Sequence, residues 1–157
     1  MTRLWVALMT AMAVLGQNSP PCSSVEARAF DFWVGSWTVQ QPGGKKLGEN
    51  KIERLLGGCV LMENWRGAMG REGKSWNYWH AASRTWKQHW VDAAGQVTEY
   101  IGVPTANGKR FEAETDGVVN VMTFTRRDDG TVEQKIEISG DGRKTWTSGF
   151  LGIYSKR

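Results

Sequence analysis

Cysteine, histidine and proline are scarce in this chain of 157 residues, which contains two, two and four of them respectively. With only two histidines and no cluster of thiols, we expect neither a metal site nor a cofactor such as haem. The cysteines are not spaced as C-x-x-C, which argues against zinc and thioredoxin-type chemistry. Motifs of the G-x-S-x-G, H-E-x-x-H and phosphate-loop types are also missing. The sequence therefore contains no familiar catalytic motif.

Charge of one sign is not concentrated anywhere in the sequence. The formal net charge is +4, and basic pairs such as Lys45-Lys46 and Arg143-Lys144 lie at turns scattered along the chain. Nucleic-acid binding requires a concentrated basic patch, usually with interleaved aromatic residues. We therefore expect no nucleic-acid partner and interpret these charges as solvated loop residues that aid solubility.

Long apolar runs are missing except for one near the start of the chain. Leu4 to Leu15 is apolar apart from Thr10, follows a positively charged start and precedes Gly16. A helix that spans a bilayer needs about 20 residues, so this run is too short. Its pattern is typical of a secretory signal peptide. We predict a signal peptide over residues 1–16, export to the periplasm or the medium, and no stable membrane anchor after processing. The alternatives are an uncleaved anchor and a buried N-terminal helix.

Export changes the interpretation of the two cysteines. Cys22 lies in the predicted N-terminal segment, residues 17–29, and Cys59 lies in the single predicted domain, residues 30–157. In an oxidising compartment the two can form a disulfide, whereas in a reducing one they stay free thiols. The residues alone leave both possibilities open.

Turn signals recur from Trp37 onward, and four of them are Asn-Gly or Asp-Gly pairs, the strongest short hairpin signal. The nine turn signals together predict ten short antiparallel strands, which follow a short helical turn between Val25 and Phe32. Open sheet edges invite aggregation, and closing the sheet removes them. We therefore predict an all-β, up-and-down antiparallel barrel of about ten strands, with a β-sandwich as the alternative.

Alternation of side chains identifies the inward faces of several predicted strands. Trp86, Gln88 and Trp90 share one face of a strand, while charged or polar neighbours including His89 take the other. By the same parity Gln134 faces inward, and both histidines face outward. On the third predicted strand parity leaves open whether Glu63 and its face mates point inward or outward.

Two longer motifs resemble those of a known family. Residues 30–37 read F-D-F-W-V-G-S-W, and residues 58–65 read G-C-V-L-M-E-N-W. These motifs are similar to those of a bacterial, mostly exported family of unknown function in the calycin (lipocalin-like) superfamily. The resemblance implies a lipocalin-like barrel and a disulfide between Cys22 and Cys59. It also implies that Trp37 plugs one barrel end under a basic residue of the last strand, either Lys156 or Arg157. It implies no established activity.

Barrels of this size can hold one small molecule among their inward side chains. The resemblance favours Ser75, Asn77 and Trp79 as an inward set on the fourth strand. We propose the following lining: Glu63, Trp65, Asn77, Trp79, Trp86, Gln88, Trp90 and Gln134. Aromatic walls suit a small apolar or aromatic ligand, and amides suit its orientation. The alternative is a filled barrel with a structural or interaction role.

A carboxyl group in an aromatic cavity has its pKa raised by desolvation, which suits general acid or base catalysis. Glu63 is therefore the candidate catalytic residue if the protein is an enzyme, for example an isomerase or a hydrolase. Asp92 is either a second carboxylate of the cavity or a cap of the turn toward Gly95. Binding without catalysis is the leading hypothesis.

Overall fold

The computed structural model describes residues 22–103, 105 and 108–157. The predicted signal peptide, residues 1–16, lies outside the described residues. Two short helical elements, α1 (Val25–Arg28) and η1 (Asp31–Trp33), precede the strands. The ten strands are β1 (Gly35–Gln40), β2 (Lys46–Leu55), β3 (Val60–Gly67), β4 (Glu72–His80), β5 (Thr85–Asp92), β6 (Val97–Val103), β7 (Lys109–Thr115), β8 (Val118–Arg126), β9 (Val132–Ser139) and β10 (Thr147–Lys156). A further turn of helix, η2 (Leu56–Gly58), connects β2 to β3.

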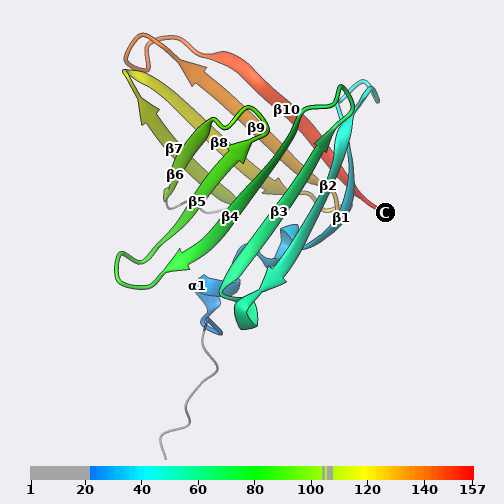
Figure 1. Cartoon of the computed structure of the whole chain (residues 1–157), viewed down its shortest axis with the longest axis vertical. Helices are drawn as coiled ribbons and strands as arrows, with labels where there is room; N and C mark the ends of the chain where they lie inside the picture. The colour runs from blue at the N-terminus through cyan, green and yellow to red at the C-terminus, as the bar shows by residue number, and fades with distance from the viewer. Residues whose placement is uncertain (1–21, 104, 106–107) are drawn as a thin grey trace, which may run out of the picture.

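The strands form one closed barrel in which each strand pairs antiparallel with the next, and β1 pairs with β10. At this seam Trp37 lies opposite Lys156, and Gln40 lies opposite Ile153. Figure 1 shows the strands in chain order around the barrel, with α1 beneath one end. The predicted up-and-down barrel with a short N-terminal helical turn is confirmed, and the β-sandwich is excluded.

The aromatic residues of the opening motif close the barrel end next to α1. The rings of Phe30 and Trp33 stack with centroids 4.9 Å apart, and Phe124 of β8 packs 4.6 Å from Trp33. The indole nitrogen of Trp37 donates a hydrogen bond to the carbonyl oxygen of Trp33 at 2.8 Å. All four side chains are almost completely buried. The motif thus forms an aromatic plug in this end of the barrel, and we call this end the closed end.

Electrostatic contacts tie the helical elements to the barrel. The Asp31 carboxylate lies 2.8 Å from the Arg28 guanidinium and 2.7 Å from that of Arg54 at the end of β2. The Ser24 hydroxyl caps α1 by accepting a hydrogen bond from the amide of Ala27 at 3.2 Å. These contacts fix the orientation of α1 and η1 over the closed end.

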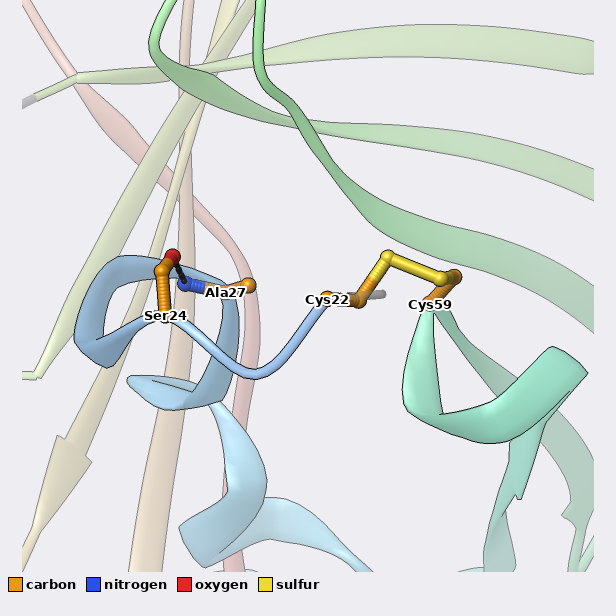
Figure 2. The surroundings of a disulfide bond; sticks show 4 residues. All are labelled: Cys22, Ser24, Ala27 and Cys59. Atoms are coloured by element: carbon orange, nitrogen blue, oxygen red, sulfur yellow. Dashed lines mark hydrogen bonds between the residues drawn. A yellow bond between two sulfur atoms is a disulfide. The ribbon is translucent and has the colours of Figure 1, made fainter. Parts of the chain in front are cut away.

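A disulfide joins Cys22, just before α1, to Cys59, just after η2 (Figure 2). The two Cα atoms are 5.0 Å apart, and 37 positions separate the residues in the sequence. The pairing implied by the family resemblance is therefore present in the structure. The bond anchors the start of the described chain to the closed end of the barrel.

Candidate functional site

The opposite end of the barrel, which we call the open end, contains a cavity of about 450 Å³. The loops joining β1 to β2 and β3 to β4 border its mouth, and the barrel interior forms its wall and floor. The smallest pockets that hold drug-sized molecules have volumes of about 300 Å³, so this cavity is large enough for such a ligand. The barrel is thus plugged at the closed end, and its larger cavity opens at the open end.

Aromatic and aliphatic side chains form most of the cavity wall. Trp65 and Phe150 contact each other edge to face, with ring centroids 6.0 Å apart. Trp90 lies across the backbone of Gly73 on the neighbouring strand, where a Cβ atom would come within 2.2 Å of the indole ring. Only glycine leaves room for the ring in this position. The wall also includes Leu47, Tyr100, Met122 and Ile136.

The floor of the cavity holds a buried carboxyl group, that of Glu63 on β3, which is 4% exposed. Its two oxygens accept hydrogen bonds from different sides, from the Asn50 amide at 2.6 Å and from the Ser75 hydroxyl at 2.6 Å. Behind Ser75, Asn77 donates to the Ser75 hydroxyl at 2.8 Å, and Gln88 donates to the Asn77 carbonyl at 2.7 Å. Each donor in this series of hydrogen bonds therefore points toward Glu63.

A second set of polar contacts continues from Asn50 to the other side of the barrel. The Asn50 amide nitrogen lies 3.4 Å from the Tyr154 hydroxyl, and that hydroxyl donates a hydrogen bond to the Gln134 carbonyl. The Gln134 amide in turn contacts the Met122 sulfur at 3.1 Å. The Asn50 carbonyl oxygen is buried and has no hydrogen-bond partner within the described residues. A belt of polar side chains thus runs from β5 through β2 to β9.

Burial changes the acidity of the groups in this belt. Desolvation raises the pKa of Glu63, although the hydrogen bonds from Ser75 and Asn50 oppose the rise. The pKa of Tyr154 is raised well above its ordinary value, mainly by desolvation and to a smaller extent by the nearby charge of Glu63. No salt bridge to Glu63 is present in the described part of the chain. The site therefore favours a protonated carboxyl group over a wider pH range than an exposed glutamate has.

Five of the eight residues predicted to line the barrel interior do surround this cavity: Glu63, Trp65, Gln88, Trp90 and Gln134. Asn77 points inward as expected, but it is completely buried beneath the floor, where it also donates to the Leu61 carbonyl oxygen at 3.1 Å. It therefore positions other polar groups and does not face the cavity.

Trp79 and Trp86 lie elsewhere, and their predicted place in this lining is corrected. Both border a smaller hollow of about 290 Å³ at the closed end, beside α1. The Trp86 indole donates a hydrogen bond to the carbonyl oxygen of Glu26 in α1 at 2.9 Å. Side-chain alternation predicted the correct face of the strand for Trp79 and Trp86. At their level of the barrel, however, α1 and the plug occupy the interior.

Asn50 and Tyr154 were not anticipated from the sequence, although they complete the polar belt. Asn50 lies on β2, where outward charged residues from Glu49 to Glu53 alternate with Gly48, Asn50 and Ile52. That alternation is a usable signal for the inward face. For Tyr154 no such signal exists, because β10 carries apolar residues on both of its faces.

Other candidate chemical groups do not join the site. Asp92 accepts hydrogen bonds from the amides of Ala94 and Gln96, so it caps its turn and does not line the cavity. His80 contacts Ser83, and His89 lies 3.2 Å from Glu99 on the outside of the barrel. Within residues 22–103, 105 and 108–157, no group of three or more histidine, cysteine or acidic side chains is arranged to hold a metal ion.

The described helices are short. None of them has the length and apolar character needed to cross a membrane.

The arrangement suits non-covalent binding of a molecule with an apolar body and a polar end. The wall offers flat aromatic surfaces, and the floor offers a carboxyl group and two amides as hydrogen-bond partners. Comparison with known proteins adds no assignment, because no protein-family model matches the chain and no curated protein matches it either.

Proposed function

We propose that this protein binds a small apolar or aromatic molecule in the open end of its barrel. The observation that carries the proposal is the cavity of about 450 Å³, with a largely apolar wall and a hydrogen-bonding floor. A cavity of this volume disfavours the alternative of a filled barrel. The opening motif F-D-F-W-V-G-S-W and the barrel support membership in the calycin superfamily. Ligand binding inside the barrel is also what that resemblance leads us to expect.

We further propose that binding takes place after export from the cell. The apolar run that ends before Gly16 and the disulfide between Cys22 and Cys59 support this, since disulfides persist in oxidising compartments.

Removing a wall residue tests the binding proposal. The neutral dye phenylnaphthylamine is a suitable probe because its fluorescence rises in apolar surroundings. Trp90→Leu removes much of one aromatic wall, so we expect the dye affinity to fall by about tenfold. The matched control is Trp76→Leu, since Trp76 lies on the outer face of β4 and is 45% exposed. Equal affinities in the parent and both variants would contradict binding in the cavity.

A second candidate function is acid or base catalysis by Glu63, because its carboxyl group faces the cavity and its pKa is raised by burial. Nitrophenyl ester hydrolysis, measured against pH, tests this for a hydrolase. Glu63→Gln should remove the part of the rate that follows the titration of one carboxyl group. Glu133→Gln, which changes an outward glutamate of β9, should not. A pH profile that is the same in all three proteins would exclude catalysis through Glu63.

A further inference from the structure

Apart from Glu63 at the floor, the charged residues that line the cavity are all basic. They are Lys45, Lys46 and Arg71, and all of them lie at the mouth. Lys45 lies in the connection between β1 and β2, Lys46 is the first residue of β2, and Arg71 lies in the connection between β3 and β4. The charge along the cavity therefore changes from basic at the mouth to acidic at the floor.

The backbone holds the two connections together. The amide of Ala68 donates to the carbonyl oxygen of Leu47 at 2.8 Å, and the amide of Gly67 donates to that of Arg71 at 2.7 Å. The first bond joins the β3–β4 connection to β2 next to Lys46, and the second closes the turn that carries Arg71. The basic residues thus extend from a fixed frame around the mouth.

Two of the three basic side chains are available to a ligand. Lys46 forms an ion pair with Glu49 at 2.8 Å. Lys45 and Arg71 are exposed, and within the described part of the chain neither side chain forms a salt bridge or a hydrogen bond. Exposed cations that are not held in an ion pair attract anions and raise their local concentration.

We infer that the ligand is an amphipathic anion, whose carboxylate, sulfate or phosphate group lies at the mouth near Lys45 and Arg71 while its apolar body lies in the cavity. This inference rests on the proposed function. The orientation follows from the floor, because an anionic group beside the buried Glu63 would face another acidic group, and Glu63 has no salt bridge to any of the described residues. A neutral hydrogen-bonding group suits the floor, and the anionic group suits the mouth.

Two dyes that differ by one anionic group test this inference. Anilinonaphthalene sulfonate carries a sulfonate, and phenylnaphthylamine has the same ring system without it. At low ionic strength we expect the sulfonate dye to bind at least several-fold more tightly than the neutral dye. Raising the ionic strength from about 0.01 M to about 1 M shortens the Debye length from about 30 Å to about 3 Å. This change should weaken binding of the sulfonate dye and leave that of the neutral dye unchanged or stronger.

A charge variant locates the effect. Lys45→Ala/Arg71→Ala removes both available cations, and exposed ion pairs each account for about 1.5-fold to fivefold in affinity. We therefore expect a loss of about twofold to 25-fold for the sulfonate dye and no loss for the neutral dye. The control is Lys74→Ala/Lys87→Ala, which removes two positive charges from the outer faces of β4 and β5. This control should bind both dyes like the parent.

The possible results separate this inference from the proposed function. If both dyes bind with equal affinity and neither responds to the loss of Lys45 and Arg71, the inference is wrong and the cavity proposal stands. If the control variant loses as much affinity for the sulfonate dye as Lys45→Ala/Arg71→Ala does, net charge explains the effect and the inference is also wrong. If neither dye binds the parent protein, the proposed function itself fails.

Discussion

The ammonium group of Lys156 lies 4.2 Å from the centre of the Trp37 ring. The same group donates a hydrogen bond to the carbonyl oxygen of Val34 at 2.7 Å. Gly35 lies beneath it with φ of 139°, and a Cβ atom there would come within 2.5 Å of the ammonium nitrogen. The last strand, the first strand and the opening motif therefore meet at one side chain. Of the two basic residues that the resemblance suggested, Lys156 occupies this position, and Arg157 pairs with Glu49.

We expect Lys156→Ala to lower the free energy of unfolding by about 1–2 kcal/mol, because it removes a cation–π contact and a charged hydrogen bond. Urea unfolding followed by tryptophan fluorescence measures the loss. Lys51→Ala, which removes an outward lysine of β2 with one ion pair, is the matched control and should have little effect. Equal midpoints for Lys156→Ala and the parent would show that the seam does not depend on this lysine.

The disulfide should make a large contribution to stability because it closes a loop between positions 37 residues apart. The chain-entropy model gives about 4 kcal/mol for a loop of this length. We expect reduction to lower the urea midpoint of the parent protein and to leave that of Cys22→Ser/Cys59→Ser unchanged. If the reduced and oxidised parent unfold at the same urea concentration, the bond does not constrain the unfolded chain.

Glu63 should make stability depend on pH in a direction opposite to that of an ion-paired glutamate. Its folded pKa lies above the ordinary value of 4.5. Between that value and the raised value the folded protein keeps a proton that the unfolded chain has released. Within this window the free energy of unfolding falls as pH rises. We expect Glu63→Gln to lack this fall, so its stability relative to the parent should improve as pH rises through the window.

Urea unfolding at several pH values checks the Glu63 prediction. Glu133→Gln, on the outer face of β9, serves as the control, and its stability relative to the parent should not improve over the same range. A constant difference between Glu63→Gln and the parent at every pH would mean that the buried carboxyl group titrates like an exposed one.

Trp86→Phe tests the assignment of Trp86 to the closed end. The substitution removes the hydrogen bond to Glu26 in α1, so we expect a loss of about 1 kcal/mol in the free energy of unfolding. The affinity for phenylnaphthylamine should remain that of the parent, because Trp86 does not line the open cavity. A loss of dye affinity comparable to that of Trp90→Leu would return Trp86 to the binding site.

The strands were predictable because each turn contains a local signal. Pairs such as Asp116-Gly117 and Asp129-Gly130 fix hairpin positions without any information from distant residues, and both lie between strands in the structure. Closure of the sheet was expected because open sheet edges invite aggregation, with a β-sandwich as the alternative. The polar side chains of the floor were partly predictable, since Gln88 and Gln134 alternate with outward charged residues.

The depth of a residue within the barrel could not be predicted from alternation. Parity places Trp86 and Trp90 on the same inward face of β5, but it does not say which lies nearer the plug. Their levels depend on strand tilt and on the place where Phe30 and Trp33 pack, and both are set by contacts distant in the sequence. The contact between Asn50 and Tyr154 spans 104 positions, so no local pattern could indicate it.

Both ends of the described chain lie on the side of the barrel away from the mouth. Cys22 is bonded beside η2, and the amide of Arg157 donates to the carbonyl oxygen of Ser36 at the start of β1. A tether attached to the carboxyl terminus would therefore hold the protein with its cavity facing away from the attachment point. Immobilisation on a sensor surface by the carboxyl terminus should leave access of small molecules unhindered, and the same geometry would let a fused neighbour sit beneath the barrel without obstructing it.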